Sequence, residues 1–534
     1  MTRLTDLRLS PTRLLWIALP YVLFAALAWY EFSTILALNQ GKFTYSLDDP
    51  YIHLALAQRI AHGSYGINPG ESAAPSSSIL WPFLLVPFAG APFFELVPIA
   101  YNLLIALATI YVYTQVGKYL LPMPESPPSA TRDFKITAIT IPLILATNLV
   151  GLAYTGMEHT LQVFLCAVVV LGVIRMLAEQ AVPGWLVAAL VITPLVRYEA
   201  LAVTLPALAL MFLCHRWKAF ALALGSTAAS LGAFSIFLVT QGIGWLPTSV
   251  LAKVSFAGYR PTQNFIIDHI RFNLELPQGQ VLAGMMLALV LLAVARRRAP
   301  WTERALGFLA AGGGLAHLAA GQFGWMDRYE VYIIAATLLY LLYLGRGLLG
   351  WLFEHLGALT TAALLLGLST LVGQPYYADI ERTPGAAANI YEQQYQMHRF
   401  VVDYLKAPVA VNDLGWVAFG NPNYVLDLWG LASPQALEAR THAGIWQVDW
   451  MARMVAQHNI RLVMIYASPG WFPAQPSAWT AVARLHLGHP QVSAGDDTVT
   501  FFVPDPAQAD SVRAMLRAFA PTLPPGVDLT FIPY

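Results

Sequence analysis

The chain has 534 residues, of which 57% are apolar and only 11% are charged, and its formal net charge is zero. A mean hydropathy of +0.56 excludes an ordinary soluble protein. The balanced charge leaves no basic patch or tail of the kind that binds nucleic acid. Cys166 and Cys214 both lie in apolar segments, so they predict neither a disulfide framework nor a metal site.

The N-terminal segment predicts a first membrane span that is not cleaved. Arg3, Arg8 and Arg13 precede a long apolar stretch at 14–38, which is too long for a signal-peptide core and is followed by no small-residue cleavage site. Further apolar segments lie at 95–118, 136–153, 159–176, 183–197, 199–214, 218–240, 279–296, 304–321, 330–346 and 351–373. We therefore expect a polytopic α-helical membrane protein with about 11 spans.

One more apolar stretch, 79–94, contains Pro82, Pro87 and Pro92. A backbone broken by proline leaves polar groups that lipid cannot satisfy, so we expect this stretch to be interfacial or re-entrant. If the 79–94 stretch is not counted as a membrane span, the strong basic clusters fall in loops on the same side as the N-terminus. Cytoplasmic loops are expected to be rich in such residues. These residues are Lys118, Arg132, Lys135, Arg175, Arg216, Lys218, Arg296, Arg297, Arg298, Arg304 and Arg346.

The remaining polar residues then gather on the opposite, extracytoplasmic face. They occupy five connecting segments, namely 48–78, 155–159, 197–199, 241–278 and 324–330. From about residue 375 short apolar runs alternate with helical stretches, which predicts an extracytoplasmic α/β domain at 375–534. The expected strands are 409–411, 424–428, 462–466 and 498–503, and the expected helices are 387–405 and 447–458.

Two adjacent carboxylates, Asp48 and Asp49, stand soon after the first span. Like charges side by side raise each other's proton affinity, which suits a general base. Asp49 is also a good N-cap for a helix that starts at Pro50, with His53 on one of its faces. Since the cap engages Asp49, we expect Asp48 to be the freer carboxylate and the base.

Three basic residues, Arg197, Lys253 and Arg328, lie on the outer face against the charge bias. Local salt bridges account for each of them singly, and an anionic ligand such as a phosphate accounts for all three together. Glu158 and His159 form a pair in the 155–159 turn. There Glu158 either caps the next helix, or the pair orients a substrate hydroxyl or takes part in binding a metal.

The motifs together resemble those of the C-fold membrane glycosyltransferases, above all the mycobacterial terminal arabinofuranosyltransferases and their relatives. The resemblance rests on the order and spacing of short motifs over most of the chain. These are Asp48-Asp49, Asn68-Pro69-Gly70-Glu71, Ser77-Ser78-Ile79-Leu80-Trp81, Gly156-Met157-Glu158, Arg197-Tyr198-Glu199, Ala252-Lys253, Arg328-Tyr329, Asn412-Asp413-Leu414-Gly415 and Asp427-Leu428-Trp429-Gly430-Leu431. The chain departs from its relatives at Ala74-Pro75-Ser76 and at His159-Thr160, so their sugar specificity does not carry over.

The resemblance implies a transmembrane glycosyltransferase domain at 1–374 with a catalytic first outer loop at 39–78, in a bacterial cytoplasmic membrane. It implies transfer of a sugar, with a pentofuranose such as arabinose as one candidate, from a polyprenyl-phosphate donor to a glycan, lipid or protein acceptor with inversion. Membrane lipid is a further partner, and nucleic acid is not expected. Asp48 would act as base with Asp49 beside it. Arg328, Lys253 and Arg197 would bind the donor phosphate.

We expect the substrate to contact Glu158, His159, Glu199, Tyr329 and His53. No cofactor is predicted with certainty, and participation of a divalent metal stays open. Two other classes remain as alternatives. A transporter predicts ionisable residues near mid-span, of which His317 is the main example here. The other alternative is a non-catalytic protein that binds or assembles envelope glycans. It would not explain the adjacent carboxylates of Asp48 and Asp49.

Overall fold

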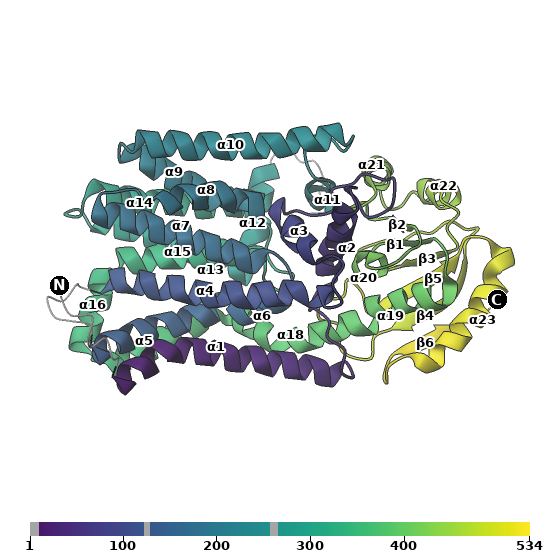
Figure 1. The fold of residues 1–534 in the computed structure, drawn as a ribbon, viewed down its shortest axis with the longest axis horizontal. Coiled ribbons are helices and arrows are strands. Elements are labelled where there is room, and N and C mark those ends of the chain that lie inside the picture. Colours follow the sequence, from purple (N-terminus) through teal and green to yellow (C-terminus); the bar gives the residue numbers. More distant parts are fainter. Residues whose placement is uncertain (1–9, 122–128, 257–264, 534) are drawn as a thin grey trace.

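The computed structural model describes residues 10–121, 129–256 and 265–533, and it divides into a long helical bundle and a smaller sheet domain (Figure 1). The α-helices up to residue 372 are α1 (Pro11–Leu38), α2 (Asp49–Ala61), α3 (Leu80–Leu85), α4 (Val97–Leu120), α5 (Ala130–Ala146), α6 (Leu149–Tyr154), α7 (His159–Glu179), α8 (Gly184–Val196), α9 (Leu201–Leu213), α10 (Trp217–Thr240), α11 (Thr248–Phe256), α12 (Phe265–Glu275), α13 (Pro277–Ala295), α14 (Trp301–Ala320), α15 (Val331–Leu344), α16 (Arg346–His355) and α17 (Ala358–Val372).

The long helices run nearly parallel to the long axis of the molecule, and the sheet domain lies beyond one end of them (Figure 1). Within the described residues, five helices are long and apolar enough to cross a membrane, or up to seven if each of two bent helix pairs forms one span. Large apolar side chains such as Leu222, Ile236 and Leu359 are exposed on their outer surfaces, which suits contact with lipid. All eleven predicted segments contain helices, but several are short, so the count of about 11 spans stays a prediction.

The proline-rich stretch 79–94 forms short helical pieces too short to span a bilayer. It contains α3 and the 3₁₀ turn η1 (Val86–Phe88), and the turn η2 (Phe94–Leu96) follows before α4 begins. A bilayer core of about 30 Å needs roughly 20 helical residues, and none of these pieces approaches that length. This agrees with the expected interfacial or re-entrant segment.

The polar loops separate to the two ends of the bundle, as the charge pattern predicts. At the end far from the sheet domain, basic residues of the expected inner loops form ion pairs, which are Arg13–Asp133, Arg175–Glu179, Arg296–Glu303 and Arg346–Glu303. At the other end, the expected outer segments contact one another. Ser46 N–H donates to Tyr154 O at 3.1 Å, and Ile79 N–H donates to Leu195 O at 3.1 Å.

The C-terminal domain is a mixed six-stranded sheet with helices around it. Its strand order is β2-β1-β3-β5-β4-β6, in which β1, β2 and β3 are parallel and β4, β5 and β6 are antiparallel. The strands are β1 (Val409–Val411), β2 (Val425–Asp427), β3 (Leu462–Ile465), β4 (Thr480–His486), β5 (Thr498–Val503) and β6 (Asp528–Phe531). The helix α18 (Gln374–Glu392) leads into this domain and packs against α1, α5 and α6 of the bundle. The helical elements that follow are α19 (Gln394–Arg399), the π-helical turn η4 (Phe400–Leu405), α20 (Gly415–Ala418), α21 (Pro434–Ala443), α22 (Asp449–Gln457), α23 (Ala509–Phe519) and the 3₁₀ turns η5 (Pro506–Gln508) and η6 (Ala520–Thr522). The 3₁₀ turn η3 (Tyr198–Ala200) belongs to the bundle, between α8 and α9.

The two parts are joined through α2, which lies between the bundle and the sheet domain (Figure 1). The Tyr51 ring stacks on the Trp416 ring with centroids 4.0 Å apart, and Leu56 of α2 belongs to one buried cluster with Val411 and Val417. At the start of α2, the Asp48 carboxyl accepts hydrogen bonds from the backbone N–H groups of Gly415 at 2.6 Å and Trp416 at 2.8 Å. The outer loop is thereby fixed to the sheet domain.

Gly415 has no space for a side chain at this joint. A Cβ there would lie 2.6 Å from Oδ2 of Asp48 and closer still to its carbonyl oxygen. We predict that Gly415→Ala lowers the unfolding free energy by about 1–3 kcal/mol, as overpacking of a tight contact does. Gly470→Ala is the matched control, because a Cβ at Gly470 meets nothing within 4 Å. Thermal unfolding of the purified proteins in detergent measures both, and equal unfolding temperatures would contradict the prediction.

Candidate functional site

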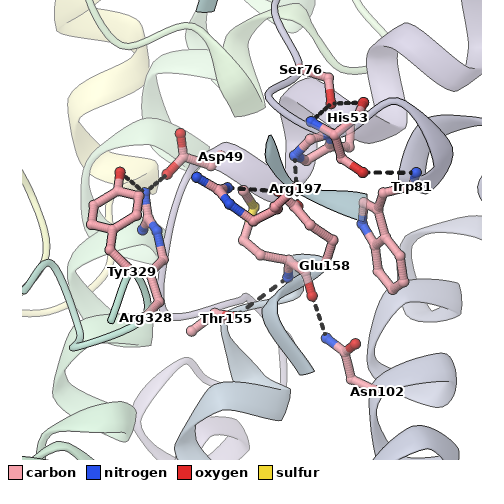
Figure 2. A network of polar contacts seen from close by, with 12 residues as sticks. Asp49, His53, Ser76, Trp81, Asn102, Thr155, Glu158, Arg197, Arg328 and Tyr329 are labelled. Carbon is pink, nitrogen blue, oxygen red and sulfur yellow. Dashed lines mark hydrogen bonds and ion pairs between the residues drawn. The ribbon is translucent and has the colours of Figure 1, made fainter. Parts of the chain in front are cut away.

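The predicted polar residues converge where the bundle meets the sheet domain. Figure 2 shows Asp49, Glu158, Arg197, Arg328 and Tyr329 gathered there from four separate segments of the chain. They are held by the start of α2, the 155–159 turn, the break between α8 and η3, and the loop that precedes α15. Because each segment ends a helix at the same end of the bundle, short local breaks are enough to bring the side chains together.

Arg197 is the centre of a buried ion network. Its Nη1 donates to Glu158 Oε1 at 2.8 Å, and its Nη2 donates to Glu199 Oε1 at 2.7 Å. The Arg197 side chain is 1% exposed and that of Glu158 is fully buried, whereas the Glu199 side chain is 32% exposed. His53 Nε2 lies 3.5 Å from Oε2 of Glu158. The local salt bridge expected between Arg197 and Glu199 is therefore present, with Glu158 as a second partner.

Glu158 occupies the N-cap position of α7 but makes no side-chain capping hydrogen bond. Its carboxylate turns to Arg197 and His53, so the capping interpretation is wrong for its side chain. Breaking a buried pair such as Arg197–Glu158 by removing one partner costs about 3–5 kcal/mol, because it leaves an uncompensated charge. This network is consequently a rigid wall of the site.

A second pair brings Arg328 onto Asp49. Arg328 Nη2 lies 2.7 Å from Oδ2 of Asp49 and 2.9 Å from the Tyr329 hydroxyl, as Figure 2 shows. The Arg328 side chain is 3% exposed, but that of Asp49 is 32% exposed. Among the residues that the structure describes, Nε and Nη1 of Arg328 have no hydrogen-bond partner. A buried guanidinium thus keeps donor capacity beside an accessible carboxylate.

The Tyr329 ring makes cation–π contacts with both Arg197 and Arg328. The guanidinium carbon of Arg328 lies 4.7 Å from the ring centroid and that of Arg197 lies 5.6 Å from it. The buried His159 ring contacts Tyr329 edge-on, with centroids 5.9 Å apart. Both guanidinium groups therefore contact the same aromatic ring, and their charges face the carboxylates of Asp49, Glu158 and Glu199.

The loop before Arg328 is conformationally strained. Gly324 has φ +83, and the three non-glycine residues Trp325, Met326 and Asp327 follow with φ of 53, 62 and 45. Each left-handed non-glycine residue costs about 1–2 kcal/mol. The loop is held by Gln278, whose Nε2 donates to Asp327 at 2.7 Å, and by Glu330, which accepts from Gly324 N–H at 3.0 Å. These contacts set the direction in which Arg328 leaves the backbone.

The structure reverses the expected roles of the acidic pair at the helix start. Asp48, and not Asp49, occupies the N-cap position of α2, and its side chain makes no capping bond. Asp48 is only 6% exposed, and each of its carboxyl oxygens already accepts a backbone N–H from the sheet domain. The prediction that Asp49 is the cap and Asp48 the freer carboxylate is therefore wrong, because it took no account of partners from the C-terminal domain.

Asp413 of the sheet domain faces Asp48. Burial raises the pKa of the Asp48 carboxyl well above its ordinary value, the neighbouring Asp413 raises it further, and the Trp416 amide lowers it. Burial also raises the pKa of Asp413, whose Oδ2 accepts from Gln394 at 2.7 Å and from the Tyr466 hydroxyl at 3.1 Å. Two buried carboxyls in contact favour a shared proton. The sequence gives no signal for this pair, because its members are hundreds of residues apart.

Other predicted motifs bind the domains to each other. Asn68 Nδ2 donates to Val425 O at 2.9 Å, and Val425 N–H donates back to Asn68 Oδ1 at 3.0 Å. Glu71 accepts from the Tyr424 hydroxyl at 2.9 Å. Lys253 belongs to α11, but its side chain lies outside the described residues, so its predicted contact with phosphate is not tested.

The described residues contain no group of three or more His, Cys, Asp or Glu side chains placed to hold a metal ion. Within the site, the Glu158 and Asp49 carboxylates already face Arg197 and Arg328. A divalent cation prefers several oxygen ligands without a competing cation beside them. The carboxylates of this site therefore do not fit a divalent cation.

Fold and site together define a helical membrane protein with a buried cluster of arginines and carboxylates next to a sheet domain. Residues 388–502 match a family model described as a domain of unknown function, DUF8728, which covers less than half of the chain. No curated protein matches. Solved structures similar to the chain include three at 10–16% identity.

Two of these structures are the oligosaccharyltransferase of Archaeoglobus fulgidus. The form with zinc and sulfate has a TM-score of 0.43 and 11% identity, covering 95% of this chain and 75% of that one. The apo form has a TM-score of 0.43 and 10% identity, covering 89% and 75%. The third is the R1389S mutant of arabinofuranosyltransferase AftD from Mycobacteria, with a TM-score of 0.40 and 16% identity over 90% of this chain and 41% of that one.

The raised pKa of Asp48 predicts a specific dependence of stability on pH. A carboxyl whose pKa is higher in the folded protein holds its proton longer there, so stability is fully present below the ordinary value of 3.8 and falls as pH rises through the raised value. We expect the unfolding temperature of the wild type to fall as the pH is raised from the ordinary value of 3.8 through the raised pKa of Asp48. The fall should be smaller in Asp48→Asn, which has no proton to lose at that position.

Glu354→Gln, at an exposed residue of α16, is the control and should keep the wild-type slope. Differential scanning fluorimetry of the three proteins across this pH range makes the comparison. The same slope in Asp48→Asn as in the wild type would contradict the assignment.

Proposed function

We propose that this protein is a membrane glycosyltransferase that takes a sugar from a polyprenyl-phosphate donor. The observation that supports this most is the Asp49–Arg328 pair, in which an accessible carboxylate lies 2.7 Å from a buried guanidinium with two nitrogen atoms still unbonded among the described residues. Glycosyl transfer from a phosphate needs a base for the incoming hydroxyl and positive charge for the departing phosphate. This pair supplies both within one contact.

In the proposed reaction, Asp49 accepts the proton of the acceptor hydroxyl. The acceptor oxygen then forms a bond to the anomeric carbon while the bond between that carbon and the phosphate oxygen breaks. The bonding electrons leave with the phosphate, whose growing negative charge is met by N–H groups of Arg328. A single in-line displacement of this kind inverts the anomeric centre. Arg197 adds positive potential from beyond the Tyr329 ring.

Asp49 is preferred to Asp48 as the base for a geometric reason. Both oxygens of Asp48 accept backbone N–H groups within a buried joint, whereas the Asp49 side chain is one-third exposed. A base must reach the proton that it abstracts, and Asp48 would have to leave the joint to do so. We assign Asp48 the role of positioning residue, since it fixes the backbone from which Asp49 extends.

The membrane setting suits a lipid-linked donor. The site lies at the end of helices that are apolar and long enough to cross a bilayer, next to the short helices of the 79–94 segment. An isoprenoid tail would stay in lipid while its phosphate reached Arg328. We place this end, with the sheet domain, on the extracytoplasmic side of the bacterial cytoplasmic membrane, because the opposite end has the basic clusters. A pentofuranose such as arabinose is one candidate for the sugar.

One observation favours transport as a second candidate function. Glu31 lies within α1, is fully buried, and has no hydrogen-bond partner for either carboxyl oxygen among the described residues. Buried intramembrane carboxylates are common in proton-coupled transporters. His317, the other intramembrane candidate, packs against Phe323 and Tyr332 and bonds the Tyr332 hydroxyl at 3.0 Å, as a structural residue would. Substrate uptake into proteoliposomes without a chemical product would favour this alternative.

The first test of the proposal is Asp49→Asn. Asparagine keeps the size of the side chain but cannot accept the acceptor proton, so transfer should fall by about 10²–10⁴-fold. The assay uses purified protein, a panel of polyprenyl-phosphate sugars and mass analysis of the product. The unfolding temperature of the variant is measured beside the rate, because Asp49 is also the ionic partner of the buried Arg328. Wild-type transfer by Asp49→Asn would overturn the assignment.

The second test is Arg328→Gln, which removes the charge facing the departing phosphate. Removing one such transition-state donor lowers the rate by about 10²–10³-fold. Arg328→Lys should recover part of the loss, since it restores the charge without the planar fork. Arg304, at the opposite end of the bundle, serves as the control through Arg304→Gln. Equal rates for the two glutamine variants would exclude Arg328 from the reaction.

A further inference from the structure

A cleft lies apart from the Asp49–Arg328 pair, between the outer loop and the sheet domain. Its volume is about 1770 Å³, and its walls include Glu71 and Ser72 of the loop, Thr248 of α11, and much of α21. Pockets for single small molecules occupy about 300–1,000 Å³. This cleft is larger, which suits an extended ligand made of several units.

Aromatic rings line the cleft. Trp446 is 68% exposed and lies in its wall. Tyr424 stacks on His458 with ring centroids 4.5 Å apart and planes within 6°, and Trp429 carries the Arg440 guanidinium 4.0 Å from its ring centroid. Flat, rigid aromatic faces give large contact area at low entropic cost. The apolar face of a sugar ring is a ligand surface that matches such platforms.

The polar lining of the cleft is mixed and nearly balanced in charge. Glu71 and Glu438 supply carboxylates, and Gln241 and Gln435 supply amides that both donate and accept hydrogen bonds. Arg440, which also lines the cleft, donates through Nε to Trp429 O at 3.0 Å. A polyphosphate or nucleic acid would need a concentration of basic side chains. A neutral chain rich in hydroxyl groups fits this lining better.

The cleft is built jointly by both parts of the protein, and the outer loop that forms part of its wall also carries the proposed base. That loop runs from Asp49 at the start of α2 to Glu71 in the cleft wall. Thr248 accepts from Ala74 N–H at 3.2 Å and donates to Leu431 O at 2.5 Å, which joins loop, α11 and sheet domain at the cleft. A ligand held here would therefore lie against the same segment that carries the proposed base.

We propose that this cleft binds the acceptor, and that the acceptor is a neutral oligosaccharide. This proposal rests on the proposed glycosyl transfer, because only a transferase has an acceptor. Binding of the oligosaccharide to the cleft can nevertheless be measured without any donor. Exposed Trp446 packs against a sugar ring, and Glu438 on the solvent face of α21 accepts from sugar hydroxyls.

The test is equilibrium binding of three soluble probes, which are hexasaccharides of arabinan, mannan and glucan, to the purified full-length protein by isothermal titration calorimetry. At least one should bind saturably. Trp446→Ala and, separately, Glu438→Ala should weaken that binding at least tenfold without changing the unfolding temperature. Trp351→Ala is the matched control, because Trp351 is 48% exposed on α16, at the end of the bundle far from the sheet domain (Figure 1).

Saturable binding that depends on Trp446 supports the cleft even if no donor on the panel supports transfer. The proposal is overturned if none of the three probes binds. It is also overturned if both cleft variants bind with wild-type affinity, or if an unglycosylated peptide competes equally with the hexasaccharide.

Discussion

The site depends on one contact, the capture of the Asp48 carboxyl by the backbone amides of Gly415 and Trp416. It joins a loop of the bundle to a domain that begins hundreds of residues later. Asp49 is the next residue, so the direction of its side chain is set by the anchoring of Asp48 and by the first turn of α2. If Asp48 were released, the loop would keep its contacts through Asn68, Glu71 and Tyr51, but the direction of Asp49 would lose its nearest anchor. Of the two adjacent carboxylates, Asp48 thus anchors the loop, and Asp49 is the proposed reactive group.

The two arginines near this contact differ in how fully they are paired. Arg197 is paired with Glu158 and Glu199, which fixes its position and offsets its charge, while Arg328 has only part of its donor capacity used within the described residues. Preorganised charge of this kind needs no rearrangement when negative charge develops on a substrate. The strained 324–327 loop fits the same interpretation, since strain of several kcal/mol persists only where surrounding contacts impose it.

Much of the fold could be predicted from the sequence because apolar length and charge bias are strong local signals. They placed the helices, separated the loops to two ends and located the sheet domain with strands β1, β2, β3 and β5. Strand β4 was missed because two of its seven residues are alanine, which is uncommon in strands, and β6 because it is a short edge strand. The helices α8 and α9 are short and contain Pro194 and Pro206, which keeps the number of spans open.

The site was predictable as a set of residues but not as a set of contacts. Positively charged residues on the outer face, against the charge bias, indicated Arg197 and Arg328, and the turn between two spans indicated Glu158; the structure brings the three side chains into one cluster. The roles of Asp48 and Asp49 were not predictable, because the partners of Asp48 are main-chain N–H groups, which have no signature in the sequence. Asp413, Gln394 and Tyr466 were likewise invisible as one cluster until the fold brought them together.

The most direct test of the account is a structure of the protein with a polyprenyl phosphonate sugar, a donor analogue that cannot transfer its sugar. The account predicts that the phosphonate lies on Arg328, that the Asp49 carboxylate faces the anomeric carbon, and that Asp48 still accepts from Gly415 and Trp416. A phosphonate bound away from Arg328, or an Asp48 carboxylate freed from the joint and turned to the sugar, would contradict it.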